Sequence, residues 1–205
     1  VGIIGTGATA IQSIPHLGEH AQHLYVFQRT PSSVDERNNT PTNPKWVEKL
    51  KPGWQGQRNR NFTALLDGIL LAEIADFQKM NEIRDRVDHT VTDAGTAEAL
   101  KPWFGQWCKR PTFNDDYLPT FNRPNVTLVD TGGQGVDRVT EHGVVVDGTE
   151  YPVDCLVFAT GFEVGTAYVR RAEFNMYGRD GRSLEEAWAG GMRTFHGFLS
   201  HGFPN

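Results

Sequence analysis

The 205-residue sequence contains little cysteine, and this limits the kinds of protein that it can encode. Its two cysteines, Cys108 and Cys155, stand far apart and form no CxxC pair. A disulfide scaffold or a structural zinc site would need more cysteines at closer spacing. His196 and His201 lie in an expected loop, and no cysteine or carboxylate stands at metal-ligand spacing from them. We therefore expect no disulfide, no metal site and a cytoplasmic location.

Long apolar runs and an excess of basic residues are also missing. No stretch approaches the ~20 apolar residues of a membrane span, and no basic-then-apolar signal peptide opens the sequence. The formal net charge is −5, whereas nucleic-acid-binding domains usually present a basic face. We expect neither a membrane nor a nucleic acid as a partner. The chain begins inside an expected strand, without methionine, so we also expect it to be part of a longer polypeptide.

The first twelve residues carry the strongest positive signal. Four strand-forming residues run into Gly5-Thr6-Gly7-Ala8-Thr9-Ala10, and an apolar series at helical spacing starts at Ile11. Gly5 would turn the chain sharply, Gly7 would let a pyrophosphate approach the backbone, and Ala10 would let the helix pack closely on the strand. The free N–H groups at the helix start would then face the phosphates. The pattern predicts a dinucleotide-binding unit, with a tight turn in another fold as the alternative.

The next expected strand indicates which dinucleotide is bound. It covers residues 24–27 and ends in Gln28-Arg29-Thr30-Pro31. In an NAD-binding unit an acidic residue near this strand end binds the ribose 2′-hydroxyl, whereas an arginine suits the 2′-phosphate of NADP. Gln28 and Arg29 occupy that place here, so the sequence favours NADP. An ordinary solvated arginine is the alternative.

The rest of the sequence predicts an α/β fold with a helical insertion and a small β-meander. Apolar residues recur at roughly helical spacing over residues 62–88, which predicts helices interrupted near Gly68 and after His89. Residues 126–129 predict another strand, and Asp147-Gly148 is a strong hairpin signal within an expected meander. Ser183 with Glu186 predicts a capping box at the start of a short helix.

Two further segments carry candidate chemistry. Residues 155–158 predict a buried strand that ends in Ala159-Thr160-Gly161, where small residues allow a ligand or another backbone to approach. Lys109-Arg110 is an adjacent basic pair beside aromatic residues, in a chain with only 20 lysines and arginines. An exposed basic turn would explain that pair equally well.

Together these segments resemble the NADP-binding part of a Baeyer–Villiger monooxygenase, a flavin-dependent ketone oxygenase. The resemblance covers nearly the whole chain and rests on residues 5–12, 27–31, 109–111, 117–126 and 158–162. It implies the following arrangement: a Rossmann-like NADP domain over 1–35 and 104–160, a helical insertion over 36–103, and a segment, 161–205, that leads back to an FAD domain. The FAD glycine motif and the family fingerprint, which normally precede the position of Val1, are not in this sequence. We therefore expect the chain alone to be inactive.

The resemblance also implies roles for single residues. NADP(H) would be bound by Gly5, Thr6, Gly7, Ala8, Thr9, Ala10, Gln12, Ala159, Thr160 and Gly161, with Arg29, Thr30 and Lys109 on its 2′-phosphate. Arg110 would be the catalytic arginine. The implied reaction uses NADPH, FAD and O2 to convert a ketone into an ester or lactone, with the FAD domain of the same polypeptide as partner. The ending, residues 195–205, is similar to members that take large or cyclic ketones.

Two other functions share parts of this pattern. A different flavoprotein monooxygenase, one that oxygenates nitrogen or sulfur, would have the same glycine turn and the same Ala159-Thr160-Gly161 segment, but it would not need Lys109-Arg110. A stand-alone NADP-binding or sensing domain would need neither FAD nor a ketone.

Overall fold

The computed structural model describes residues 1–66, 69–162 and 166–204. By its internal contacts the chain divides into two units, Val1–Gly161 and Phe162–Asn205. The interruption expected near Gly68 lies outside the described residues. None of the described helices is long and apolar enough to cross a membrane.

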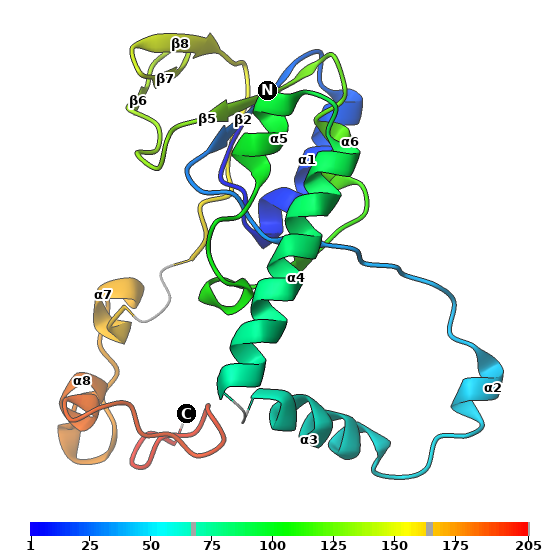
Figure 1. Cartoon of the computed structure of the whole chain (residues 1–205). Helices are drawn as coiled ribbons and strands as arrows, with labels where there is room; N and C mark the ends of the chain where they lie inside the picture. The colour runs from blue at the N-terminus through cyan, green and yellow to red at the C-terminus, as the bar shows by residue number, and fades with distance from the viewer. Residues whose placement is uncertain (67–68, 163–165, 205) are drawn as a thin grey trace. The chain divides into compact units, whose positions relative to one another are not determined.

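The first unit is built on a parallel sheet of four strands (Figure 1). The strands are β1 (Gly2–Ile4), β2 (Leu24–Gln28), β5 (Val126–Asp130) and β9 (Leu156–Phe158). Their order in the sheet is β5-β2-β1-β9, so the chain builds outward on one side of β1 and later returns to its other side. This is the strand order of a Rossmann half-domain.

The alternation of side chains along the strands gives the sheet two buried faces. On one face, Ile3, Leu24 and Val26 pack against the buried Ile11 and Ile14 of α1 (Ala8–His20). On the other face, Phe27 and Val129 pack against the β-meander. Each strand is therefore apolar on both sides, which is why these short segments read as apolar runs in the sequence.

The meander consists of β6 (Arg138–Val139), β7 (Gly143–Val146) and β8 (Thr149–Pro152), paired antiparallel. Val144 and Val146 are buried against the sheet, and the ring of Tyr151 lies edge-on to Phe27 with 5.7 Å between centroids. The hairpin expected at Asp147-Gly148 is confirmed, since both residues have positive φ, 48° and 73°.

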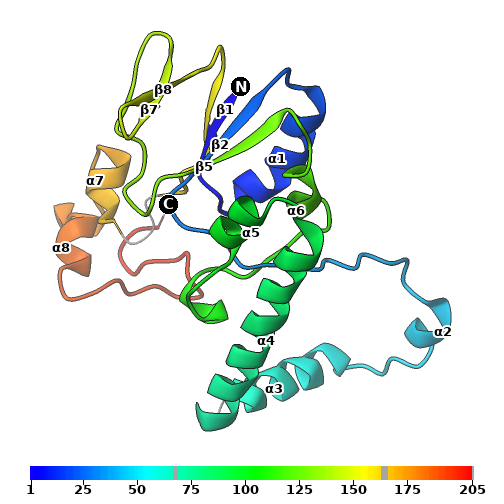
Figure 2. The same ribbon diagram turned by 45° about the horizontal axis from the view of Figure 1, so that its top comes forward.

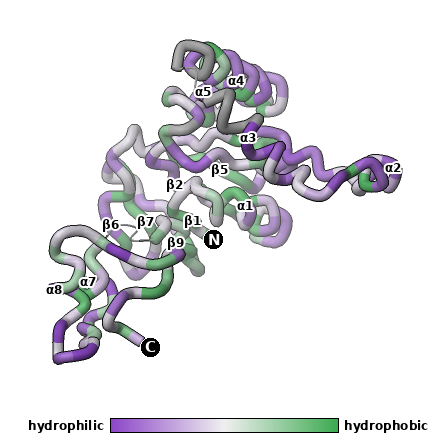
Figure 3. Tube along the Cα trace, turned by 90° about the horizontal axis from the view of Figure 1, so that it is seen from below, coloured by the Kyte–Doolittle hydropathy of each residue, from purple (hydrophilic) through white to green (hydrophobic). Residues whose placement is uncertain are grey.

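Among the described residues, the insertion forms four helices. They are α2 (Pro44–Val47), α3 (Trp54–Leu66), α4 (Ile69–Thr90) and α5 (Ala94–Leu100). The long helix α4 buries Met80, Ile83 and Val87 and runs beside α5 and α6 (Tyr117–Thr120) (Figures 1 and 2). In Figure 3 the segment around α2 is mostly hydrophilic, whereas β5 and β9 are hydrophobic. The buried part of the insertion is therefore the second half of α4 together with α5.

A second, two-stranded parallel sheet was not expected from the sequence. It pairs β3 (Val34–Asp35) with β4 (Thr112–Phe113) and joins the two ends of the insertion. Between α5 and β4 the chain forms a single turn of 3-10 helix, η1 (Gln106–Cys108), directly before Lys109. Strands of two residues have no periodic pattern, which is why sequence reasoning misses them.

The second unit contains α7 (Tyr168–Ala172), the 3-10 turn η2 (Arg179–Gly181) and α8 (Leu184–Trp188). The predicted capping box is confirmed. The Ser183 hydroxyl accepts a hydrogen bond from the Glu186 N–H, and the Glu186 carboxylate accepts one from the Ser183 N–H. The predicted fold class, a Rossmann-like α/β domain with a helical insertion and a small meander, is also confirmed.

Candidate functional site

The candidate site lies where the four parallel strands end. Their carboxyl ends carry the turn at Gly5–Gly7, the residues Arg29 and Thr30, the loop after Asp130, and Ala159–Gly161. The strand order reverses between β1 and β9, and ligands of open α/β sheets bind in the crevice at such a switch point. The structure thus brings together candidates from both ends of the first unit.

Gly5 is the tightest point of this crevice. It has φ +111°, and a Cβ placed on it would lie 2.4 Å from the carbonyl oxygen of Ala159. The Ala159 N–H donates to the Ile4 carbonyl at 2.9 Å, and the Gly5 N–H donates to the Phe27 carbonyl at 3.0 Å. Only glycine satisfies both the conformation and the space. Gly5 and Ala159 therefore shape the turn.

The start of α1 is open to a ligand. Gly7 is its N-cap residue, with no side-chain cap, and no atom lies within 4 Å of a Cβ placed on Gly7. The first helical bond runs from the Ile11 N–H to the Gly7 carbonyl at 3.0 Å. The N–H groups of Ala8, Thr9 and Ala10 therefore have no acceptor within the helix. Free N–H groups beside an open space are what a pyrophosphate needs.

Other residues in and after the turn make hydrogen bonds or packing contacts within the domain. The Thr6 hydroxyl donates to the Thr30 carbonyl at 2.7 Å, and the Ser32 hydroxyl donates to the Thr6 carbonyl. Ala10 is fully buried on the sheet, and the Gln12 amide donates back to the Ala8 carbonyl at 2.8 Å. Thr6 and Thr30 thus tie the glycine turn to the loop after β2.

Gln28 and Arg29 separate at the end of β2. Gln28 is fully buried, and its amide donates to the Ala99 carbonyl of α5 at 2.7 Å, so it holds the insertion. Arg29 lies one residue beyond the end of β2 and is exposed. Arg29 is therefore the side chain of this pair that is available to a ligand.

Arg29 and Lys109 approach each other from segments 80 residues apart. Partial desolvation lowers the pKa of Lys109 from its ordinary value of 10.5, and the nearby Arg29 guanidinium lowers that pKa further. The Lys109 ammonium lies 4.7 Å from the ring centre of Phe104. Among the described residues, no ion pair includes Arg29, Lys109 or Arg110. Because neither of these neighbouring cations is paired with a carboxylate in the described residues, their combined positive charge can attract an anion.

Arg110, Thr160 and Gly161 are all exposed. Arg110 follows Lys109 directly, and β4 begins two residues later.

Within the described parts of the chain, no group of three or more histidine, cysteine or acidic residues is arranged to hold a metal ion. Both cysteines are free and exposed.

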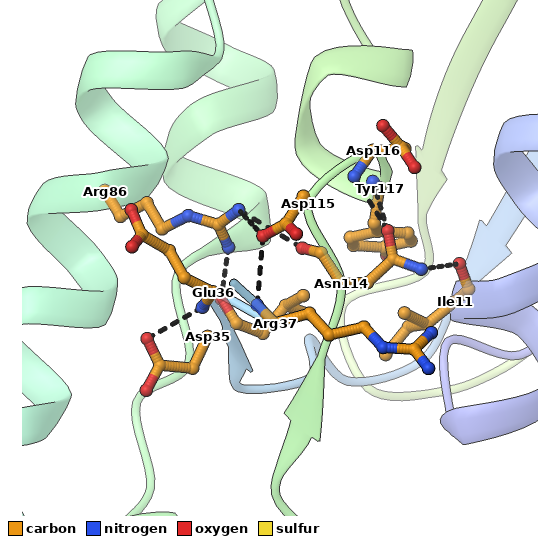
Figure 4. A network of polar contacts seen from close by, with 10 residues as sticks. Ile11, Asp35, Glu36, Arg37, Arg86, Asn114, Asp115, Asp116 and Tyr117 are labelled. Atoms are coloured by element: carbon orange, nitrogen blue, oxygen red, sulfur yellow. Dashed lines mark hydrogen bonds and ion pairs between the residues drawn. The ribbon is translucent and has the colours of Figure 1, made fainter. Parts of the chain in front are cut away.

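Sequence reasoning missed several residues around this site. Gly135, in the loop after β5, would place a Cβ 4.0 Å from Cδ of Arg29, and the run Thr131-Gly-Gly-Gln-Gly135 directly after a strand was a usable signal. Asp76 and Arg86 on α4 contact the chain on either side of Lys109-Arg110 (Figure 4 shows Arg86). No sequence signal marked these two, since charged residues on a helix are usually solvated.

The fold and the open glycine turn at the start of α1 define a Rossmann-type dinucleotide-binding domain. No protein-family model matches the chain. It is 51% identical to neopentalenolactone D synthase from Streptomyces avermitilis and 48% identical to Baeyer-Villiger monooxygenase ATR8 from Stachybotrys chlorohalonatus. These alignments cover 100% of this chain but 41% and 39% of those proteins.

Solved structures agree with these relatives. The polycyclic ketone monooxygenase from the thermophilic fungus Thermothelomyces thermophila is similar with a TM-score of 0.83 at 39% identity, over 98% of this chain and 40% of that one. A steroid monooxygenase bound to NADP is similar with a TM-score of 0.72 at 28% identity, over 98% and 46%. The chain belongs to the Baeyer–Villiger monooxygenase family, as its sequence predicted, and spans about two fifths of the length of the curated relatives it matches.

Proposed function

We propose that this chain is the NADPH-binding part of an FAD-dependent Baeyer–Villiger monooxygenase that converts a ketone into an ester or lactone with O2. The observation that carries the proposal is the open N-terminus of α1 after β1, with Arg29 at the end of the neighbouring strand β2 and Lys109 close enough for its charge to interact with that of Arg29. A solved monooxygenase with this fold holds NADP, and another holds FAD and NADP.

The described residues fit NADPH. Its pyrophosphate would accept hydrogen bonds from the N–H groups of Ala8, Thr9 and Ala10, over the bare Cα of Gly7. Its 2′-phosphate would lie between Arg29 and Lys109, whose mutual repulsion a dianion would relieve. With NADPH bound in this way, the pyrophosphate would fill the open space beside Gly7, and the 2′-phosphate would neutralise Arg29 and Lys109, which pair with no carboxylate in the described residues.

FAD, when bound, supplies the redox and oxygen chemistry. Most of the residues that would hold it fall outside this chain, and the FAD domain of the same polypeptide is the proposed partner. We assign one catalytic role here, to Arg110. Its positively charged guanidinium would favour the anionic form of a reacting oxygen and stabilise negative charge formed on the ketone oxygen.

The substrate we propose is a polycyclic ketone, acted on in the cytoplasm. Two of the similar proteins are a neopentalenolactone D synthase and a polycyclic ketone monooxygenase.

We propose no nucleic-acid partner. The chain has 25 acidic and 20 basic residues, whereas a nucleic-acid-binding domain usually carries an excess of basic residues.

Binding of NADP⁺ and NAD⁺ to the full-length protein, measured by isothermal titration calorimetry, tests the proposed cofactor. A charge-assisted contact to the 2′-phosphate is worth about 1.5–3 kcal/mol, so we expect at least tenfold tighter binding of NADP⁺. Arg29→Ala should remove most of this preference and leave NAD⁺ within about twofold of the starting affinity. Arg138→Ala, an exposed arginine of the meander, is the matched control. Equal losses for both cofactors in Arg29→Ala would show that Arg29 serves the fold or the pyrophosphate.

The affinity for NADP⁺ should fall at alkaline pH through Lys109. The 2′-phosphate favours the ammonium form, and the pKa of Lys109 in the free protein is lowered from 10.5, so the loss of affinity should begin at a lower pH than for an ordinary lysine. In that range binding takes up a proton, because the ligand raises the pKa that desolvation and Arg29 had lowered. Titrations between about pH 7 and 10 should show the loss for NADP⁺ but not for NAD⁺. A Lys109→Gln protein that kept the same pH profile would assign the effect to another group.

A further inference from the structure

The segment that carries Lys109 and Arg110 is fixed on both sides by one helix of the insertion. We propose that Asp76 and Arg86 of α4 are positioning residues that hold Lys109 in place for the 2′-phosphate and Arg110 for catalysis. The inference rests on the proposed function, because it assigns these residues a part in NADP selectivity. Such anchors have a physical use, because Lys109 and Arg29 carry like charges that disfavour their approach when no anion lies between them.

Asp76 fixes the upstream side. One carboxylate oxygen accepts a hydrogen bond from the Gln106 N–H at 2.8 Å, where η1 begins. The other would lie 2.6 Å from a Cβ placed on Gly105, so the carboxylate sits against the bare Cα of that glycine. Gly105 itself provides no side-chain cap for η1. Asp76 therefore acts as the cap of the turn that leads into Lys109.

Arg86 fixes the downstream side. Its guanidinium donates to the Val34 carbonyl at 2.9 Å and to the Asn114 carbonyl at 3.1 Å, and it lies 3.9 Å from the Asp115 carboxylate (Figure 4). The side chain is 15% exposed. It thereby joins β3 to the residue that follows β4, and β4 begins two residues after Arg110.

Asn114 connects the end of β4 to α1 and to the start of α6. Its side-chain oxygen accepts from the N–H groups of Asp116 and Tyr117, both at 2.8 Å, and its amide reaches the Ile11 carbonyl of α1 at 3.4 Å. The Asp115 carboxylate accepts from the Arg37 N–H at 2.9 Å. The end of β4 is thus connected both to the helix that begins at the glycine turn and to the start of the insertion.

The helix α4 can act as a rigid support between these anchors. Asp76 and Arg86 are ten residues apart, about 15 Å along a helix. Met80, Ile83 and Val87, each at most 2% exposed, hold α4 against the domain. Between the two anchors, the Lys79 ammonium pairs with the Asp35 carboxylate of β3 at 2.7 Å. A segment anchored on both sides to one helix, whose second half is buried against the domain, keeps its side chains in place before the ligand arrives, which reduces the entropy cost of binding.

Asp76→Ala in the full-length protein separates positioning from simple electrostatics. Removing a negative charge from the helix that anchors the Lys109 segment would, through charge alone, favour binding of the anionic NADP⁺. Loss of positioning has the opposite sign, and we expect the Kd for NADP⁺ to rise about five- to tenfold while the Kd for NAD⁺ changes less than about twofold. Asp76→Asn keeps an acceptor oxygen for the Gln106 N–H and should restore NADP⁺ affinity to within about twofold. Glu73→Ala, an exposed carboxylate one turn earlier on α4, is the control for lost charge.

Arg86→Lys provides an independent variant, since an ammonium cannot bridge two carbonyls in the fixed geometry of a guanidinium. It should weaken NADP⁺ several-fold and spare NAD⁺, with circular dichroism confirming that each variant is folded. If the unmodified protein does not prefer NADP⁺, the proposed function fails. If it does, but Asp76→Ala and Arg86→Lys keep that preference or lose both cofactors equally, the positioning role is overturned.

Discussion

Gly5→Ala should destabilise the protein severely, whereas Gly7→Ala should leave it folded and unable to bind a dinucleotide. The two glycines are two residues apart in one turn, yet their surroundings differ. Gly5 has φ +111° and would bring a Cβ to 2.4 Å from the Ala159 carbonyl oxygen, a backbone atom that cannot move without parting β1 from β9. Strain of this kind costs about 1–3 kcal/mol, and the overlap adds to it. We expect a loss of about 3 kcal/mol or more in the free energy of unfolding, measured by urea denaturation.

Gly7→Ala provides the matched comparison. Its φ is −78°, which alanine adopts readily, and no atom lies within 4 Å of the added Cβ. Stability should therefore stay within about 1 kcal/mol. The methyl group would occupy the space proposed for the pyrophosphate, so the Kd for both NADP⁺ and NAD⁺ should rise at least about tenfold. Unchanged affinity in a folded Gly7→Ala protein would move the pyrophosphate away from this turn. A stable Gly5→Ala protein would mean that β9 can shift at little cost.

Arg110→Ala should uncouple NADPH consumption from ester formation in the full-length enzyme. Arg110 is exposed and adjacent to Lys109, but consecutive side chains usually point in different directions, so Arg110 need not contact the 2′-phosphate. If its charge serves the oxygen chemistry, binding and oxidation of NADPH should be largely unchanged. Ester yield per NADPH should fall by roughly tenfold or more, as for loss of one electrostatic contact in a transition state, and hydrogen peroxide should accumulate in its place.

Two variants sharpen this experiment. Arg110→Lys should recover only part of the ester yield, because an ammonium lacks the planar fork and places its charge differently. Arg29→Ala should do the reverse of Arg110→Ala: it should raise the KM for NADPH and leave the ratio of ester to NADPH near that of the unmodified enzyme. Gas chromatography of the ester and a peroxidase assay give the two products. Normal coupling in Arg110→Ala would make this residue an ordinary surface arginine.

Local patterns carried most of what the sequence could predict. The glycine turn, the Asp147-Gly148 hairpin and the Ser183 capping box each depend on residues within a few positions of one another. Arg29 was selected by its distance from the glycine turn. Alternation along β2 could not separate the buried Gln28 from the exposed Arg29, because both faces of this strand are covered and Arg29 lies just beyond its end.

Contacts between distant segments could not be predicted in the same way. The Thr6 hydroxyl is polar and stands in the binding motif, but it faces the loop after β2 rather than open solvent. Asp76 and Arg86 look like solvated charges on an amphipathic helix, and only the tertiary structure places them on Gln106, Val34 and Asn114. Their significance depends on what lies opposite α4, and no pattern within α4 records that.

The parallel pairing of β1 with β9 sets the order in which the site can form. Gly2 pairs with Leu156, so the two strands are more than 150 residues apart in the chain. Closing a loop of that length costs entropy that local helices and hairpins do not incur. During synthesis, the first strand and α1 leave the ribosome long before β9 exists, while α4, α5 and the meander can already form from neighbouring residues. The contact between Gly5 and Ala159 is therefore among the last to form. If synthesis stops before β9, the glycine turn lacks the strand that packs against it.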